Sequence, residues 1–211
     1  MKRRESLIGT LFEDEARARG FGRVAGLDEV GRGALAGPVV AAAVILDPAA
    51  ALPEGLDDSK KLSALQRERI AEELRRTALC YSVGLVPPEE IDDTNILVAT
   101  RRAMLEAIGK LQPCADFLLI DALQLRETDL PQRAIIRGDS VSASIAAASV
   151  IAKTYRDALM RDYDAQFPHY GFARHVGYGT RAHLAALRAH GCCPIHRRSF
   201  RGVVQEEEAG G

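Results

Sequence analysis

Two adjacent carboxylates that lead into a glycine-rich turn are the feature of this chain with the clearest chemistry. Side chains alternate along a strand, so Asp28 and Glu29 diverge unless the strand ends there and the backbone bends. Gly31 and Gly33 permit that bend and expose backbone N–H groups, while Arg32 adds a rigid cationic fork. Carboxylates beside a cationic notch of phosphate size predict divalent metal ions acting on a phosphodiester.

Two further carboxylates follow short apolar segments elsewhere in the chain. Asp121 closes the run 117–120, and Asp139 follows the pair 135–136 and Gly138. Considered singly, each fits a solvated turn residue equally well, because Asp is common in turns. Sites in mixed α/β sheets form where strand ends converge, and four acids gathered there cannot all stay ionised without cations. The set therefore favours two divalent ions, ~3.5–4 Å apart, as used for phosphodiester hydrolysis.

The elements that must position these acids follow a mixed α/β pattern. Apolar and β-branched runs predict strands at 24–29, 38–46, 79–86, 117–121 and 134–137. Helical periodicity, with Ser63 as a candidate N-cap, predicts helices at 62–77, 89–111, 142–166 and 180–190. This order predicts an α/β domain with a central mixed sheet, helices on its faces and a helical C-terminal part.

Length and composition limit the organisation of the chain. With 211 residues it is most simply one domain over 21–202, with a short helical or frayed extension (1–20) and an acidic flexible tail (203–211). No apolar run approaches the ~20 residues of a membrane span, and the start lacks the apolar region of a signal peptide. The four cysteines have no disulfide-framework spacing, which indicates reduced thiols in a cytoplasmic protein. We expect a monomer with no membrane contact.

Charge is unevenly distributed, although the formal net charge is only −1. Between Ala165 and Gln205 there is no acidic residue, and that stretch contains all 5 histidines of the chain. It also contains Arg174, Arg181, Arg188, Arg197, Arg198 and Arg201. A basic, acid-free segment favours a polyanionic partner, with an arginine-rich solvated helix face that binds nothing as the alternative.

Three other functional interpretations are weaker. The glycines within 31–37 precede a strand instead of the helix that a dinucleotide site requires. Adjacent cysteines at 192–193 chelate zinc poorly even with His190 and His196 nearby, so helix-end histidines and partly buried cysteines are favoured. The serines between 140 and 149 could be nucleophiles, but no histidine stands before them, and close helix packing is favoured.

Several charged side chains have two open interpretations. Lys60, Lys153 and Arg156 are candidate neighbours of a substrate phosphate, and an ordinary surface or ion-pair role is equally compatible with the sequence. Asp157 stands four residues before Arg161, so an intrahelical ion pair is favoured over a place in the site.

Several ordered motifs together match one known family. They are 26–33 (GLDEVGRG), 36–44 (AGPVVAAAV), 58–62 (DSKKL), 136–139 (IRGD), 145–153 (IAAASVIAK), 156–157 (RD), 177–180 (GYGT) and 196–200 (HRRSF). On these segments the chain resembles ribonuclease HII, the type 2 ribonuclease H family, over roughly 20–202.

The resemblance implies a ribonuclease H-like fold and an endonuclease acting on RNA–DNA hybrids and on ribonucleotide-containing duplex DNA. It implies cleavage of the RNA strand and incision 5′ of embedded ribonucleotides, leaving 5′-phosphate and 3′-OH ends. The catalytic residues that it implies, as ligands of two Mg²⁺ or Mn²⁺ ions, are Asp28, Glu29, Asp121 and Asp139. The substrate-binding residues that we expect are Gly31, Arg32 and Gly33 at the ribose 2′-OH and phosphate, Tyr178 stacked on the following sugar, and Lys60.

Two positions depart from the pattern of the family, and two alternative functions stay open. Val176 stands where the family often has a lysine, which puts one phosphate contact in doubt. Ala122 stands where many members have a glycine, a mild change that the turn should tolerate. A ribonuclease HIII-like enzyme normally carries a substrate-binding domain that 1–20 cannot form. A non-catalytic hybrid-binding protein would not need four acids, because they repel phosphate unless metal is present.

Overall fold

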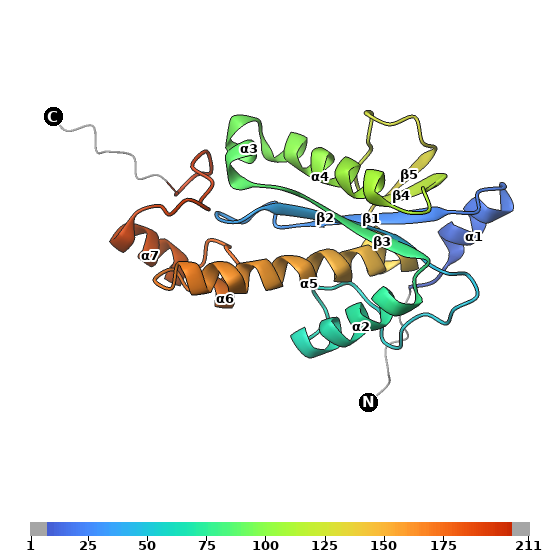
Figure 1. The fold of residues 1–211 in the computed structure, drawn as a ribbon, viewed down its shortest axis with the longest axis horizontal. Coiled ribbons are helices and arrows are strands. Elements are labelled where there is room, and N and C mark those ends of the chain that lie inside the picture. Colours follow the sequence, from blue (N-terminus) through green and yellow to red (C-terminus); the bar gives the residue numbers. More distant parts are fainter. Residues whose placement is uncertain (1–7, 204–211) are drawn as a thin grey trace.

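A five-stranded mixed sheet forms the centre of the molecule (Figure 1), whose computed structural model describes residues 8–203. The strands lie in the order β3-β2-β1-β4-β5. Their bounds are β1 (Val24–Val30), β2 (Val39–Ile45), β3 (Cys80–Val86), β4 (Phe117–Asp121) and β5 (Gln132–Ile135). β1, β4 and β5 run parallel, whereas β2 is antiparallel to both β1 and β3. The expected α/β fold with a mixed sheet is confirmed.

Helices cover both faces of this sheet. Their bounds are α1 (Leu11–Ala18), α2 (Ala64–Thr77), α3 (Pro88–Asp93), α4 (Ile96–Lys110), α5 (Ala143–Gln166), α6 (Phe172–His175) and α7 (Arg181–His190), with a short 3-10 helix at Gly138–Ser140. α4 packs on one face, whereas α5 and α2 pack on the other (Figure 1). α6 and α7 lie at the C-terminal end of α5, where they form the expected helical C-terminal part.

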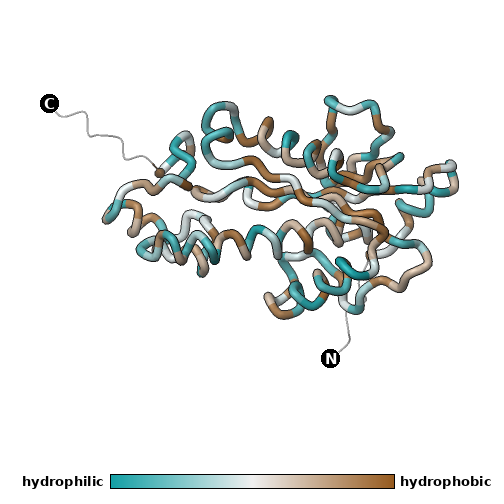
Figure 2. The backbone as a smooth tube through the Cα atoms, in the orientation of Figure 1, coloured by the Kyte–Doolittle hydropathy of each residue, from teal (hydrophilic) through white to brown (hydrophobic). Residues whose placement is uncertain are grey.

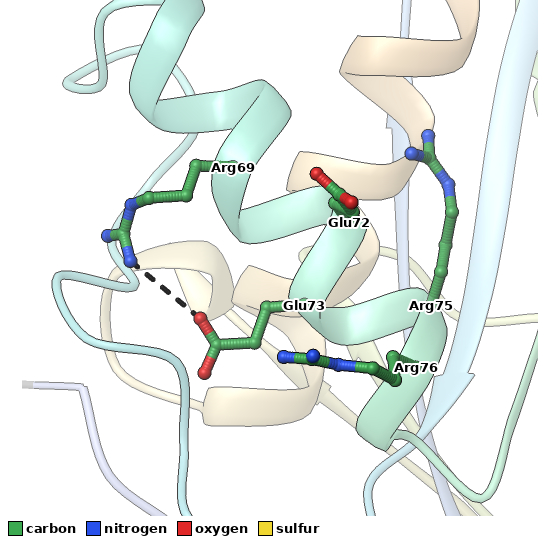
Figure 3. Close-up of a pocket in the computed structure, with 5 residues that line it drawn as sticks. All are labelled: Arg69, Glu72, Glu73, Arg75 and Arg76. Carbon is green, nitrogen blue, oxygen red and sulfur yellow. Dashed lines mark ion pairs between the residues drawn. The ribbon is translucent and has the colours of Figure 1, made fainter.

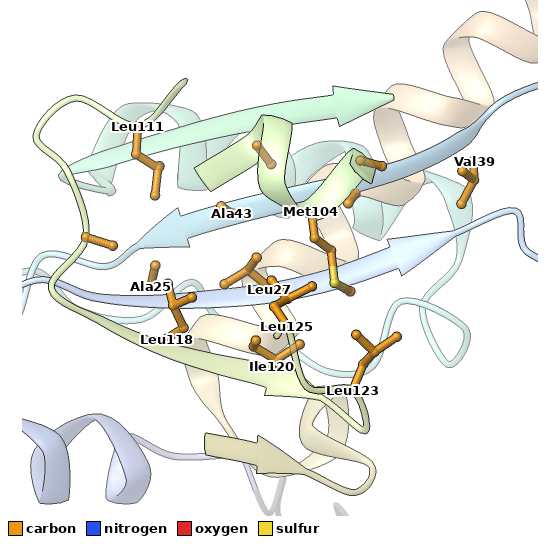
Figure 4. Packing of buried hydrophobic residues seen from close by; sticks show 14 of the residues in the cluster. Ala25, Leu27, Val39, Ala43, Met104, Leu111, Leu118, Ile120, Leu123 and Leu125 are labelled. Carbon is orange, nitrogen blue, oxygen red and sulfur yellow. The ribbon is translucent and has the colours of Figure 1, made fainter. Parts of the chain in front are cut away.

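The two cores meet at the fully buried strand β2. Alternate residues of a strand face opposite sides, so Val39 and Ala41 enter the core under α4, whereas Val40 and Ala42 enter the core under α5. Figure 4 shows Met104 of α4 within the first of these cores. Hydrophobic residues concentrate along the central strands, and the outer helices and loops are more hydrophilic (Figure 2).

Glycines allow the helices to approach the sheet closely. A Cβ on Gly26 of β1 would collide with the backbone of Ser144 at the start of α5. A Cβ on Gly84 of β3 would likewise collide with the carbonyl oxygen of Ala103 in α4. α5 can therefore lie directly against β1, near whose end Asp28 and Glu29 stand.

The prediction of a single helix at 89–111 is wrong, because this stretch forms two helices, α3 and α4. α3 ends at Asp93, and the Asn95 side chain then accepts hydrogen bonds from the backbone N–H groups of Leu97 and Val98, each at 3.0 Å. An N-cap residue of this kind starts a new helix. The other helix starts agree better with the sequence, and Ser63 forms a full capping box with Gln66.

The short N-terminal helix α1 is anchored through a buried carboxylate. Oε1 of Glu13 accepts hydrogen bonds from the Ser142 hydroxyl (2.7 Å) and from the Ser144 hydroxyl (2.6 Å) and N–H (2.8 Å). These serines therefore join α1 to the start of α5 through hydrogen bonds, a contact that the sequence does not predict. Of the acidic tail expected at 203–211, Val203 is described and is buried, and the rest lies outside the described residues, as do residues 1–7. None of the described helices combines the length and hydropathy required to cross a membrane.

Candidate active site

Four carboxylates meet at one edge of the sheet. Because β1, β4 and β5 are parallel, their carboxyl ends lie at the same edge. Asp28 and Glu29 stand near the end of β1, Asp121 ends β4, and Asp139 lies in the 3-10 helix that follows β5. Burial, with a contribution from the charge of Asp139, raises the pKa of Asp121. The fold thus brings the ends of the strands that carry these acids to one edge of the sheet.

Asp28 lies deepest of the four. Its Oδ1 accepts the Glu29 N–H at 2.8 Å. The nearby hydroxyl of Ser149 on α5 forms a hydrogen bond with that of Ser59 at 2.9 Å. Burial, followed by the charges of Glu29 and Asp121, raises the pKa of Asp28 to about 8. Without a nearby cation Asp28 therefore favours a proton near neutral pH, and a bound metal ion would take that proton's place.

Side-chain cations contact two of the acids. Lys60 Nζ lies 3.0 Å from Asp139 Oδ2, and Arg32 Nη1 lies 3.0 Å from Glu29 Oε1. Partial burial would lower the pKa of Lys60, but the hydrogen bond to Asp139 and the charges of Asp139, Asp58 and Asp28 together outweigh this and raise the pKa.

The donor set fits hard divalent cations. All four acids supply carboxylate oxygens, the ligands that Mg²⁺ and Mn²⁺ prefer. Oε2 of Glu29 is buried without a hydrogen-bond partner, so one acceptor in the site has no proton donor. Within residues 8–203, no three side chains of Asp, Glu, His or Cys lie close enough together to share one ion in their present positions. In this arrangement Arg32 and Lys60 occupy one oxygen each of Glu29 and Asp139.

The turns after β4 and β5 place Asp121 and Asp139 through left-handed residues. Ala122 has φ 48° and Arg137 has φ 56°, a region that L-residues adopt at a cost. The Gly138 N–H donates to Asp121 Oδ1 at 2.7 Å, and the Ala122 N–H donates to the Ile135 carbonyl at 3.0 Å. The two turns thus hold each other and fix both acids.

Ala122→Gly is expected to stabilise the protein. Glycine adopts positive φ without the Cβ penalty of ~1–2 kcal/mol, which outweighs its larger loss of chain entropy, so we expect a gain of about 0.5–1 kcal/mol in the free energy of unfolding. Urea denaturation measures it. Ala185→Gly, in the exposed middle of α7, is the matched control and should lose about 1 kcal/mol. A similar loss in the free energy of unfolding for Ala122→Gly and Ala185→Gly would contradict backbone strain at Ala122.

The side chain of Arg156 packs against the backbone of the glycine-arginine-glycine turn. Gly31 has φ 91°, and a Cβ there would collide with the Arg156 guanidinium. Gly33 faces the ring of Tyr178, since a Cβ on it would lie 3.9 Å from Tyr178 Cε1. Gly31 is therefore required by the close approach of Arg156 and by its positive φ, whereas a Cβ on Gly33 would make only ordinary van der Waals contact with Tyr178. The loop and the tyrosine form one surface.

The alternative that Arg156 neighbours a substrate phosphate is wrong. Its side chain is fully buried and donates to the carbonyls of Pro38 (2.9 Å), Val176 (2.8 Å) and Ala36 (3.0 Å). Burial lowers the pKa of Arg156. Sequence reasoning missed this structural role because nothing in the local pattern distinguishes a buried arginine.

A second buried arginine, Arg197, supports the same loop from another direction. It donates to the carbonyls of Gly37 (2.9 Å) and Arg32 (3.0 Å). Burial and the neighbouring Arg156 lower the pKa of Arg197 to about 9. Arg197 was predicted as part of a basic surface, whereas the structure places it beneath the turn that Arg32 belongs to.

The ion pair expected between Asp157 and Arg161 is also wrong. Asp157 Oδ1 instead lies 2.6 Å from Lys153 Nζ, and Arg161 pairs with Glu68 of α2 at 3.4 Å. Lys153 keeps its place beside the site, because it lines the same pocket as Asp28.

That pocket has a volume of about 300 Å³ and joins the acids to the candidate substrate-binding residues. Its lining residues are Asp28, Glu29, Val30, Ser59, Lys60, Ser149, Lys153 and Tyr178. Tyr178 is 37% exposed, so its ring is accessible to a ligand. The pocket therefore combines carboxylates, ammonium groups and one accessible aromatic ring.

Other surface features lie away from the carboxylates. A shallow pocket on α2 is lined by Arg69, Glu72, Glu73, Arg75 and Arg76 (Figure 3). Arg69 pairs with Glu73 there at 3.7 Å, and the mixture of signs is that of a solvated helix face. In the basic C-terminal segment the exposed arginines are Arg174, Arg181, Arg188, Arg198 and Arg201.

Comparison with known proteins gives a consistent match. The family model described as Ribonuclease HII matches residues 25–203. Ribonuclease HII of Syntrophotalea carbinolica is 54% identical over 199 residues, which cover 94% of this chain and 95% of the relative.

Solved structures agree with this match. The structure of the PCNA:RNase HII complex from Archaeoglobus fulgidus has a chain that aligns with TM-score 0.74 and 28% identity, covering 86% of this chain and 95% of that one. Bst-RNase HIII in complex with Mn²⁺ aligns with TM-score 0.63 and 21% identity, covering 86% of this chain and 68% of that one, and supports the fold alone.

Proposed function

The chain belongs to the ribonuclease HII family, and from this we propose how its own residues cut and select the substrate. The family consists of metal-dependent endoribonucleases that act on RNA–DNA hybrids. We propose further that this enzyme incises 5′ of ribonucleotides embedded in duplex DNA and leaves 5′-phosphate and 3′-OH ends. The convergence of four carboxylates beside the glycine-arginine-glycine turn is the observation that carries the proposal.

The four acids would bind two Mg²⁺ or Mn²⁺ ions. Asp28 and Asp139 would hold one, and Asp28, Glu29 and Asp121 the other, so Asp28 would bridge them. Bound divalent ions lower the pKa of a water that attacks phosphorus and stabilise the leaving 3′-oxygen. The raised pKa of Asp28 and the unpaired Glu29 oxygen support this assignment, because both indicate missing positive charge.

The other pocket residues would bind and orient the strand to be cut. Arg32 and Lys60 now contact Glu29 and Asp139, and each would turn to a substrate phosphate when cations bind the acids. The bent backbone from Gly31 to Gly33 would contact the ribose 2′-OH, which is the group that distinguishes RNA from DNA. Tyr178 faces Gly33 and would stack on the sugar that follows the ribonucleotide.

One comparison tests the reaction. A duplex carrying a single ribonucleotide is incubated with the protein in Mg²⁺, in Mn²⁺ and in EDTA, and the ends of the product are mapped. We expect cutting on the 5′ side of the ribonucleotide with either metal and none in EDTA. A non-catalytic hybrid-binding protein would retain the duplex without cutting it.

Tyr178→Ala is expected to separate the two substrates. The loss of one aromatic stacking contact, ~1–3 kcal/mol, should lower kcat/KM on a single embedded ribonucleotide by roughly 10–100-fold. Long hybrids offer many registers and should lose less than about threefold, because any register can be cut. Tyr155→Ala, which removes a tyrosine of similar exposure from α5, is the control. Equal losses on both substrates would remove the junction-reading role from Tyr178.

Two further properties form part of the proposal. We propose that the enzyme is a monomer, and that it acts in the cytoplasm, since its four cysteines are free thiols. The ribonuclease HIII-like alternative has less support, because the family match is to ribonuclease HII over most of the chain.

A further inference from the structure

Three buried histidines surround the backbone of the Gly177–Tyr178 turn. His183 is fully buried, and His196 and His175 are 2% and 9% exposed. None of the three lines the carboxylate pocket. His183 nevertheless hydrogen-bonds to Tyr178, whose ring lies in that pocket, and His175 hydrogen-bonds to Gly177 before it, so the cluster bears on substrate recognition.

The hydrogen bonds of His183 and His196 form a directed chain. Nδ1 of His196 lies 2.9 Å from the Cys193 N–H, 3.1 Å from the Cys193 Sγ and 3.3 Å from the Cys193 carbonyl. Because the contact with the N–H donor is the shortest, we infer that Nδ1 accepts and that the proton lies on Nε2. Nε2 of His196 lies 3.0 Å from Nε2 of His183, which must therefore accept. Nδ1 of His183 then carries the proton and donates to the Tyr178 carbonyl at 3.0 Å. The backbone at Cys193 thereby sets the tautomer of both rings.

His175 holds the other side of the turn. Its Nδ1 accepts the Gly177 N–H at 3.3 Å, while its Nε2 lies 2.8 Å from the Tyr170 carbonyl and must donate to it. The ring of His175 stacks on that of His183 with centroids 4.5 Å apart. A donor on one ring and an acceptor on the other thus hold the turn at both ends.

The Gly177–Tyr178 turn also packs against residues 35–36, which follow the loop proposed to contact the ribose 2′-OH. Gly177 has φ 84°, and a Cβ there would collide with the Ala36 carbonyl oxygen. The Leu35 N–H donates to the Gly177 carbonyl at 2.8 Å. A shift at Tyr178 would therefore change the spacing between its ring and Gly33.

We propose that His183, oriented by His196, is a positioning residue that fixes the Tyr178 ring at the mouth of the carboxylate pocket. The role rests on the proposed function of Tyr178 as the reader of the ribonucleotide junction. His183 itself contacts no reacting atom, so its loss should change substrate discrimination and leave the cutting chemistry intact.

The tautomers of the wild-type protein provide a test that needs no variant. Long-range ¹H–¹⁵N correlation spectra at neutral pH should show His183 protonated at Nδ1, and both His196 and His175 protonated at Nε2. A proton on Nε2 of His183 or on Nδ1 of His196 would reverse the chain and overturn the proposal.

Two substitutions at His183 test its consequence. His183→Leu removes both polar contacts, whereas His183→Asn keeps an N–H donor near the position of Nδ1. For the leucine variant we expect kcat/KM on a single embedded ribonucleotide to fall about tenfold, the effect of one lost hydrogen bond, with a loss under about threefold on long hybrids. The asparagine variant should recover to within about threefold of wild type. His190→Leu, at the exposed end of α7, is the matched control and should leave both rates unchanged.

The outcomes separate this inference from the proposed function. Equal losses of the leucine variant on both substrates, or no recovery in the folded asparagine variant, would overturn the positioning role. If wild-type protein cuts long hybrids but not single ribonucleotides, the proposed function of Tyr178 fails. The tautomer spectra still decide whether the chain of histidines exists.

Discussion

Asp139→Asn should lower Mg²⁺-dependent cleavage by at least about 10²–10³-fold, the range for loss of one strong electrostatic stabiliser of a transition state. Asp139 is 4% exposed and lies beside Lys60, so the carboxylate has little solvent to screen it. Asparagine keeps the shape and one oxygen but supplies no negative charge. Initial rates on a duplex with one ribonucleotide, measured over a range of Mg²⁺ concentrations, provide the measurement.

The fold of this variant should survive, because among residues 8–203 the donors to the Asp139 carboxylate are the Lys60 and Ser140 side chains. Asp116→Asn is the matched control, since Asp116 precedes β4 at the opposite edge of the sheet and caps the Gly22 and Arg23 N–H groups at 3.1 and 2.8 Å. That control should cut at close to the wild-type rate. If Asp139→Asn also turned over at close to the wild-type rate in Mg²⁺, the assignment of the four acids as metal ligands would be untenable.

The gathering of the acids could be predicted from sequence because it depends on strand ends. Asp28, Asp121 and Asp139 each follow an apolar run, and such runs become neighbouring parallel strands in a mixed α/β sheet. The periodicity and composition of an apolar run are local properties of the chain, so they can be recognised in a single sequence. The same reasoning found Ser63 as the N-cap of α2, because a cap and its partner at Gln66 are three residues apart.

The supports beneath the site could not be predicted, because they join segments far apart in the chain. Arg156 lies 118 residues from Pro38, whose carbonyl it contacts, and its sequence neighbours resemble those of a surface helix. Glu13 and the serines of α5 are separated by 129 residues or more. The break between α3 and α4 was missed for a different reason. Helical periodicity continues across it, and only the cap at Asn95 signals the new start.

Arg156→Lys should destabilise the protein by about 3 kcal/mol. The guanidinium serves three buried carbonyls at once, and a lysine ammonium of compact shape can reach about one of them. Each buried carbonyl left without a donor costs roughly 1–3 kcal/mol. For a chain of 211 residues a loss of this size lowers the melting temperature by about 6–12 °C. Urea denaturation and thermal unfolding measure it directly.

Arg156→Lys should also impair cleavage at temperatures where it stays folded. Arg156 supports both Gly31 and the segment before Tyr178, so a loosened contact disturbs the 2′-OH loop and the stacking ring together. Arg161→Lys, one turn further along α5 in an exposed pair with Glu68, is the matched control and should change stability by less than about 0.5 kcal/mol. Equal unfolding free energies for the two variants would mean that the buried guanidinium does not hold the loop. A stable Arg156→Lys variant with unchanged substrate preference would show that the support of the loop by Arg156 does not affect substrate recognition.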